Sequence, residues 1–254
     1  MSAPLGAPRI HLRVTDSTNE RARALAAAGA AGGTLVTASE QTAGRGRQGR
    51  RWSAPRGSAL LMSVVLRDAP ALLPLMSALA VCDVVGADAS IKWPNDVLLP
   101  GEDTPVGLAK VAGILAEGRP REGWIVLGIG VNVAVALEEL PAELSAGEPG
   151  RLPAATLARP RTDVEVVLAE LLGALEGRLG ASAEQTLAAW RERDALHGRE
   201  ISWTATPGGA ARCGIAEGID GEGRLVVALG DGGRTALGAG EVHLGPLVPR
   251  QVPG

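Results

Sequence analysis

The chain lacks phenylalanine and tyrosine altogether, so its only large aromatic rings are five tryptophans. Its two cysteines, Cys82 and Cys213, lie far apart and form no Cys-x-x-Cys pair, which excludes a disulfide framework and a cysteine-based zinc site. No apolar run approaches the roughly 20 residues of a membrane helix, and Met1 to Arg13 lacks the pattern of a signal peptide. The formal net charge is −3, whereas dedicated nucleic-acid binders are usually basic. We therefore expect a soluble cytoplasmic protein with reduced thiols and neither a membrane nor a nucleic-acid partner.

The length of the chain and a change in its residue pattern indicate two parts. With 254 residues, 46% of them hydrophobic, it can form a good-sized core with a small appendage. Residues 199–247 consist of short strands broken by glycine pairs and by the turn dipeptides Asp220-Gly221 and Asp231-Gly232, which is typical of a small β-barrel. We place the boundary near Leu196, giving domains 1–196 and 197–254.

The first part mixes strands with helices, which predicts an α/β or α+β fold. Residues 59–66 are almost all apolar and predict a buried strand, and residues 110–117 and 124–133 predict a hairpin. Residues 72–85 predict a helix, and Asn95-Asp96 predicts a turn. Capping boxes are expected before three further helices, on the pairs Ser17/Glu20, Thr162/Glu165 and Ser182/Gln185. Leucines spaced three or four apart between 168 and 179 predict one buried helical face.

The most informative local segment is the loop Gly44–Trp52, in which four arginines alternate with three glycines. Glycine lets a backbone approach a ligand closely, and the arginine fork suits phosphate or carboxylate. The loop is not a phosphate-binding Walker loop, because no Gly-Lys-Ser/Thr follows. A nucleotide-binding loop and a solvated or nucleic-acid-contacting basic loop both fit these residues.

Three more segments carry polar groups in apolar surroundings. Lys92–Asp96 fits the edge of a site or a surface turn with a buried Trp. Lys110 opens an apolar strand, where it could face a developing negative charge or simply end in solvent. Asn132 ends a glycine-containing strand, where it could contact a ligand or be a hydrogen-bonded core residue. The histidines His11, His197 and His243 are scattered, and we assign no metal site.

Taken in order, these motifs resemble the biotin protein ligases. That family shows an STN segment, a GRGRxGRxW loop, a KWPND segment, a K-x-A-G-I-L strand and a G-I-G-x-N strand, and here they stand at residues 17–19, 44–52, 92–96, 110–115 and 128–132. The resemblance implies a biotin/lipoate ligase-like catalytic domain with a mixed sheet and flanking helices, followed by an SH3-like barrel. Only about ten residues precede the catalytic part, so we expect the monofunctional type without a DNA-binding repressor domain.

The resemblance also implies roles for individual residues, with Arg47 and Lys110 as the catalytic groups. Biotin would be bound by Ser17, Thr18, Asn19, Gln41, Gly44, Arg45, Gly46, Arg47, Lys110, Gly113 and Ile114. ATP and the adenylate would be bound by Arg45, Arg47, Arg50, Trp52, Lys110 and Asn132. Asp96 is expected near the incoming acceptor lysine or a metal.

The implied reaction is ATP-dependent. Biotin would form biotinyl-5′-AMP with release of pyrophosphate, aided by Mg²⁺, and would then pass to a lysine of a biotin carboxyl carrier domain. The enzyme is expected to act as a monomer or a homodimer.

Three other functions fit parts of the sequence. A lipoate ligase or octanoyl transferase would share the fold, but the His-Asp motif of those relatives is missing. A nucleic-acid binder could use the arginine loop, against the net charge and the scarcity of stacking aromatic residues. A protein that only binds biotin would need neither the arginine loop nor Lys110.

Overall fold

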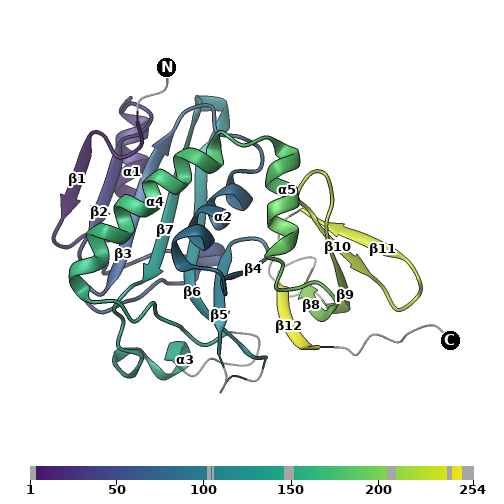
Figure 1. Ribbon diagram of the computed structural model, residues 1–254. Coiled ribbons are helices and arrows are strands. Elements are labelled where there is room, and N and C mark those ends of the chain that lie inside the picture. Colours follow the sequence, from purple (N-terminus) through teal and green to yellow (C-terminus); the bar gives the residue numbers. More distant parts are fainter. Residues whose placement is uncertain are drawn as a thin grey trace.

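A seven-stranded sheet forms the centre of the molecule (Figure 1). The computed structural model describes residues 4–101, 104, 106–145, 152–204, 210–238 and 242–247, and within them the strand order is β1-β2-β3-β7-β6-β5-β4. Strands β1 and β2 are parallel and the other neighbours are antiparallel, so the sheet is mixed as expected. The strands are β1 Arg9–Leu12, β2 Leu35–Ala38, β3 Ala59–Leu66, β4 Ser90–Lys92, β5 Asp96–Pro100, β6 Leu108–Arg119 and β7 Trp124–Asn132.

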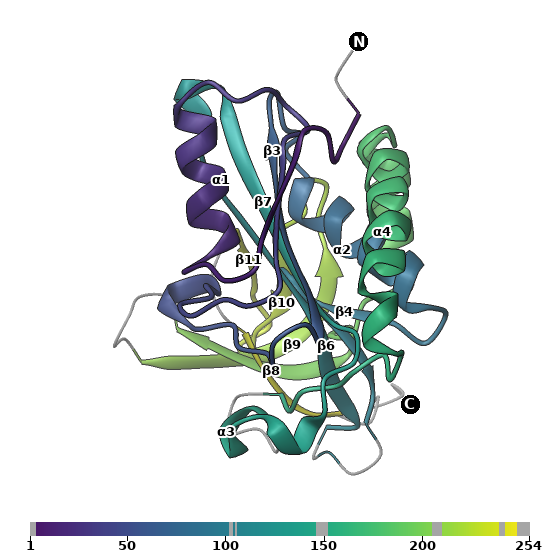
Figure 2. The same cartoon turned by 90° about the vertical axis from the view of Figure 1, so that its left-hand side faces the viewer.

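Helices cover both faces of this sheet, and Figure 2 shows it nearly edge-on between them. Helix α1 lies on one face against β3 and β7, while α2 and α4 pack together on the other. Cover on both sides explains why every residue of β3 is buried, since an apolar strand without alternation needs an apolar layer on each face. The helices are α1 Thr18–Ala27, α2 Leu73–Val85, α3 Ala142–Ser145, α4 Val164–Leu179 and α5 Ala183–Glu192. Short 3-10 turns are η1 Arg47–Gly49, η2 Pro120–Glu122, η3 Leu137–Glu139 and η4 Arg161–Asp163.

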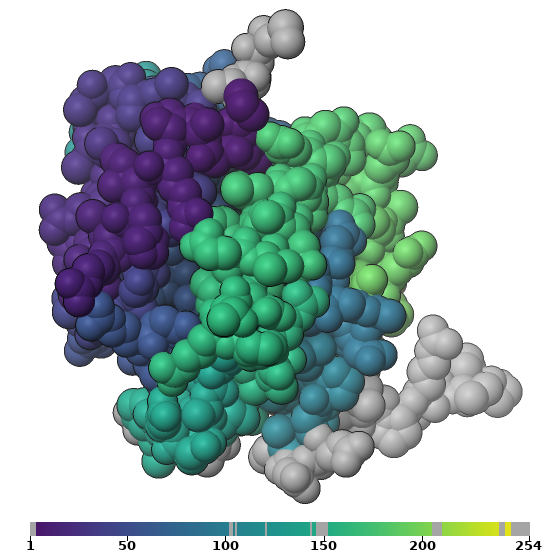
Figure 3. Space-filling model, turned by 60° about the vertical axis from the view of Figure 1, so that its left-hand side comes forward, coloured from purple at the N-terminus to yellow at the C-terminus, as the bar shows by residue number. Residues whose placement is uncertain are grey.

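Helix α4 presents the predicted leucine face to the core. Leu168, Leu171 and Leu175 are buried. Helix α4 also contacts the N-terminal strand β1, which the sequence analysis did not predict. Arg9 of β1 donates two hydrogen bonds to the carboxylate of Glu165, at 2.6 and 2.7 Å. Figure 3 shows the green α4 residues packed beside the purple N-terminal residues. The edge strand β1 is thus fixed by a partner more than 150 residues away in the sequence.

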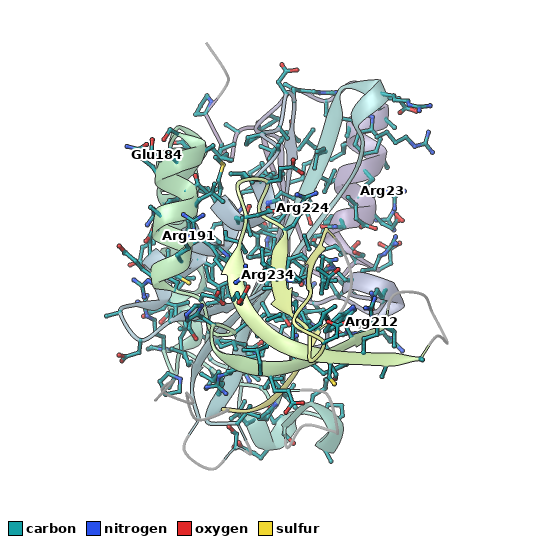
Figure 4. The ribbon with its side chains drawn as sticks, turned by 90° about the vertical axis from the view of Figure 1, so that its right-hand side faces the viewer. Arg23, Glu184, Arg191, Arg212, Arg224 and Arg234 are labelled. Carbon is teal, nitrogen blue, oxygen red and sulfur yellow. The ribbon has the colours of Figure 1, made fainter. Side chains whose placement is uncertain are left out.

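The C-terminal part forms a second, antiparallel sheet of five strands in the order β11-β10-β9-β8-β12. Its strands are β8 Arg199–Thr204, β9 Ala211–Ile219, β10 Leu225–Ala228, β11 Arg234–Leu237 and β12 Val242–Leu247. Figure 4 shows exposed arginines on it, and two of them have nearby carboxylates: Arg234 is 2.7 Å from Glu217 and Arg224 is 2.7 Å from Asp220.

The two sheets share one hydrophobic core. Ile201 and Trp203 of β8 belong to the same buried cluster as Ile91 of β4, and Trp93 Nε1 donates to the carbonyl oxygen of Gly223 at 3.0 Å. The domain boundary at Leu196 therefore stays a prediction. Residues 102, 103 and 105, and parts of the predicted β region 199–247 at 205–209 and 239–241, lie outside the described residues. No described helix is long and apolar enough to cross a membrane.

One of the predicted capping boxes is confirmed. Ser182 Oγ accepts from the backbone of Gln185 while the Gln185 side chain accepts from the backbone of Ser182. At Ser17 the prediction was wrong, because Glu20 instead pairs with Arg23 and Arg45.

The predicted box at Thr162 was also wrong, and of the predicted turn at Asn95-Asp96 only Asn95 lies in a turn. Helix α4 has no side-chain cap, since Glu165 is engaged by Arg9. The observed turn spans Lys92 to Asn95, and Asp96 already belongs to β5, paired in register with Lys92.

Candidate active site

A cavity opens at the end of the central sheet where the motifs meet. Counted out to its open mouth, with the solvent-filled space there included, it measures about 1400 Å³. Its walls come from the start of α1, the loop at 45–53, strands β3 to β7, β12, and the residues Leu140, Leu144, Leu152 and Ala154. Segments far apart in the sequence therefore form one site.

One wall consists of hydroxyl and amide groups from the start of α1. Gln41 Oε1 accepts from the backbone and the hydroxyl of Thr18, at 2.7 and 3.0 Å. Ser63 Oγ on β3 lies 2.8 Å from Thr18 Oγ1 and 2.6 Å from Asn19 Oδ1, although its single proton can go to only one of them. Ser17, Thr18 and Asn19 are all buried. Hydrogen bonds among Thr18, Asn19, Gln41 and Ser63 hold these side chains in place, so the wall is already formed before a polar ligand binds.

The arginine loop folds back on itself as a small hairpin. Arg45 and Arg51 form an isolated antiparallel bridge, and the backbone of Gly46 donates to the carbonyl oxygen of Arg50 at 2.7 Å. Gly44 lies at the base, where its carbonyl oxygen accepts from the backbone of Trp52 at 3.0 Å. Burial lowers the pKa of Arg47, with the Asp96 carboxylate acting in the opposite direction. The hairpin thus directs arginine side chains into the cavity.

The Trp52 indole packs against two strands at positions where they carry glycine. A Cβ on Gly130 would come within 2.6 Å of the indole, and one on Gly113 within 3.0 Å. Lys110 Nζ stands 5.6 Å from the centre of the Trp52 ring, within range of a cation–π contact. Trp52 Nε1 is buried and has no hydrogen-bond partner among the described residues. Gly113 of β6 and Gly130 of β7 therefore make room for the indole ring.

Both lysines of the chain meet at one carboxylate, Asp96. Lys110 Nζ is 2.7 Å from Asp96 Oδ1, and Lys92 Nζ is 3.9 Å from Asp96 Oδ2. Burial alone would raise the pKa of Asp96, but the two lysines outweigh it and the pKa is lowered. Burial lowers the pKa of Lys92 to about 8, even though Asp96 opposes this. All other cationic side chains apart from histidine are arginines, which stay charged at any ordinary pH, so these are the only long cations able to lose a proton.

The opposite wall is largely apolar. Leu140, Leu144 and Leu152 line it, and Val242 of β12 brings the second sheet to its rim. Asn132 is buried at the end of β7, where its Nδ2 donates to the carbonyl oxygen of Ala155 at 2.8 Å. This wall offers apolar surface with a single amide, as a flat heterocycle requires.

Comparison with known proteins identifies the family. Residues 11–133 match the Biotin/lipoate A/B protein ligase family, and residues 196–245 match the Biotin protein ligase C terminal domain. The chain is 38% identical over 249 residues to the biotin–[acetyl-CoA-carboxylase] ligase of Mycobacterium tuberculosis, covering 91% of this chain and 86% of the relative. It is also 38% identical over 253 residues to the enzyme of that name from Paracoccus denitrificans, covering 98% of that relative. The chain belongs to the biotin protein ligase family.

The three-dimensional structures of biotin protein ligases agree with this assignment. The biotin protein ligase of Aquifex aeolicus in complex with biotin and ATP superposes with a TM-score of 0.75 at 26% identity, covering 94% of this chain and 98% of that one. The predicted fold class, a ligase-like catalytic domain followed by an SH3-like unit, is therefore confirmed.

The structure brings together the site residues that were predicted from the family motifs. Every predicted site residue except Gly44 lines the cavity, although their individual roles remain predictions. Ser63 was missed because a serine in an apolar strand carries no local signal, and Lys92 was noted in its motif but given no role. Among the described residues no group of three His, Cys, Asp or Glu side chains could hold a metal ion.

Proposed function

We propose that this chain is an ATP-dependent ligase that activates biotin as biotinyl-5′-AMP and then transfers it to a lysine of a biotin carboxyl carrier domain. The observation that carries the proposal is the single cavity, which places the hydroxyl and amide wall, the arginine loop and Lys110 around one space. The names of the relatives support biotin as the acid, and those from Mycobacterium tuberculosis and Paracoccus denitrificans support a carrier in acetyl-CoA carboxylase.

Biotin would lie along the polar wall. Its ureido ring can exchange hydrogen bonds with Ser17, Thr18 and Gln41, which offer both donors and acceptors. Its aliphatic chain would run past Gly113 and Ile114 on β6, which brings the carboxylate towards Lys110. Lys110 is held by Asp96 in the free protein, so contact with the ligand requires it to share or exchange that partner.

The first step joins biotin to the nucleotide. A carboxylate oxygen of biotin attacks the α-phosphorus of ATP, the bond from that phosphorus to the bridging oxygen breaks, and pyrophosphate leaves with the electron pair. Arg47 and Lys110 would offset the negative charge that collects at phosphorus. Asn132 and Trp52 would hold the adenine, with Trp52 stacking on it. Closure of the arginine loop would keep water from hydrolysing the mixed anhydride.

A magnesium ion fits this site only as a companion of ATP. Asp96 is the one carboxylate among the described residues of the cavity wall, and it already faces two lysines. Magnesium is commonly held by one or two carboxylates together with substrate phosphates, so Asp96 could take one position on it. The ion would neutralise charge on the phosphates.

The second step releases AMP. The uncharged amine of the carrier lysine attacks the acyl carbon of biotinyl-AMP, the bond from that carbon to the phosphate oxygen breaks, and AMP leaves. The amine loses one proton to solvent as the amide forms. No covalent enzyme intermediate is needed, in keeping with the buried Cys82, whose thiol pKa is raised to about 12 by burial.

The decisive test is biotin-dependent exchange of labelled pyrophosphate into ATP. We expect exchange with biotin but not with lipoate or octanoate, and a loss of at least about a hundredfold in Lys110→Ala and Arg47→Ala. Exchange with lipoate instead would assign the chain to lipoate activation. Absence of exchange with every acid would leave a binding role and refute the ligase proposal.

A further inference from the structure

Glu117, which the family motifs do not include, stands directly behind the polar wall of the cavity. It lies on β6 and its side chain is 21% exposed. Its two oxygens serve different partners: Oε2 accepts from Asn19 Nδ2 at 3.0 Å, and Oε1 pairs with Arg45 Nη2 at 3.1 Å. One carboxylate thus joins a residue of the pocket wall to a residue of the arginine loop.

The Asn19 end of this connection is rigid. Asn19 is 4% exposed, and its Oδ1 lies 2.6 Å from Ser63 Oγ. A Cβ on Gly128 would come within 2.0 Å of Asn19 Oδ1, so β7 closes the remaining side of the amide. Asn19 therefore has little freedom to turn without moving Glu117.

The Arg45 end is the more exposed one. Arg45 is 40% exposed and is held by two carboxylates, Glu117 and, at 2.8 Å, Glu20 of α1. The backbone bridge from Arg45 to Arg51 places Arg45 at the base of the loop hairpin. Arg23 of α1, labelled in Figure 4, lies 3.2 Å from Glu20 and 3.9 Å from Glu117, which adds a second cation to the cluster.

We propose that Glu117 is a positioning residue that couples occupation of the pocket at Asn19 to closure of the arginine loop through Arg45. A ligand that hydrogen-bonds to Asn19 strengthens the hold of its amide on the Glu117 carboxylate, and that carboxylate in turn holds the base of the loop. Glu20 lacks this property, because among the described residues its ion pairs go to Arg45 and Arg23 and to no residue of the polar wall. The inference rests on the proposed function in that the ligand is taken to be biotin.

The experiment compares Glu117→Gln with Glu20→Gln and with Glu122→Gln, which loses a surface pair with Arg119 at the far end of the β6–β7 hairpin. Two quantities are measured in each protein: the KM values for biotin and ATP in pyrophosphate exchange, and the rate of trypsin cleavage between Arg45 and Arg51 with and without biotin. In wild type we expect biotin to slow the cleavage. In Glu117→Gln we expect biotin to lose this protection and its KM to rise about tenfold, with less than about a twofold change for ATP.

The control variants distinguish loss of the link between Asn19 and Arg45 from the loss of a negative charge alone. Glu20→Gln should retain most of the protection by biotin, and Glu122→Gln should match wild type. Equal effects of Glu117→Gln and Glu20→Gln, or unaltered protection in Glu117→Gln, would overturn the coupling while leaving the ligase function intact. If Glu117→Gln does not fold, Glu117→Asp, which keeps the charge but is too short to reach both Asn19 and Arg45 as Glu117 does, must show the same loss. If wild type shows protection by biotin but no exchange, the coupling stands and the proposed function fails; if biotin gives no protection in wild type, the coupling is refuted.

Discussion

Replacement of Lys92 by methionine should remove a pH-dependent part of the free energy of unfolding. The Lys92 side chain is 9% exposed, and burial lowers its pKa from 10.5 to about 8, although the Asp96 carboxylate 3.9 Å away opposes this. In the unfolded chain the lysine keeps its ordinary pKa. Between these two values the unfolded state binds more protons than the folded state, so stability rises as the pH increases through this window.

The size of the effect follows from the two pKa values. A fall from 10.5 to about 8 corresponds to about 3 kcal/mol over the full window. Between about pH 7 and about pH 9.5 the wild type should gain about 2 kcal/mol relative to Lys92→Met, since an unfolded lysine is still mostly protonated at the upper limit.

The assay is urea unfolding of both proteins at a series of pH values in the presence of a chelator. Burial raises the pKa of the Cys82 thiol to about 12, so this thiol lowers the free energy of unfolding as the pH rises above about 9. Because both proteins contain Cys82, its contribution cancels in the difference between them. The chain has no tyrosine to complicate the alkaline range. A difference in free energy that stays constant with pH would refute the reasoning, because it would mean that attraction to Asp96 outweighs burial and keeps Lys92 charged.

Three further predictions follow from other parts of the molecule. Gly128→Ala should raise the KM for biotin and cost about 1–3 kcal/mol of stability, since its Cβ would meet Asn19 Oδ1 at 2.0 Å; exchange kinetics and thermal unfolding check this. Ser182→Ala should cost about 1 kcal/mol through loss of the α5 cap, whereas Thr162→Ala should change the melting temperature little, because helix α4 has no side-chain cap. Burial raises the pKa of Asp194 from 3.8 to about 6, so wild type should lose stability relative to Asp194→Asn as the pH rises from about 4 to about 6 in urea unfolding; a difference between the two proteins that does not change with pH would contradict this.

Features that depend on neighbouring residues could be predicted from the sequence. The apolar run 59–66 is a buried strand with the predicted limits, and the Ser182/Gln185 cap forms as expected. Asp220 and Asp231 make the predicted turns, because their carboxylates accept from backbone groups two residues ahead. The motifs of the site could also be recognised in the sequence, because arginines between glycines and a lysine before an apolar strand are chemically unusual by themselves.

Features that depend on distant partners could not be predicted in this way. The boxes expected at Ser17 and Thr162 fail because Glu20 and Glu165 find arginines elsewhere in the fold, and a charged partner competes well with a helix cap.

The sequence alone therefore determined the fold class, the family and a set of site residues of which all but Gly44 line the cavity. Only the tertiary structure decided how these residues are held. Ser63 and Glu117 have ordinary neighbours in the sequence, and their importance arises from packing against α1 and the arginine loop. Lys92 owes its lowered pKa to burial, which is a property of the surrounding fold, because loss of water destabilises a charge whatever residue stands beside it in the chain.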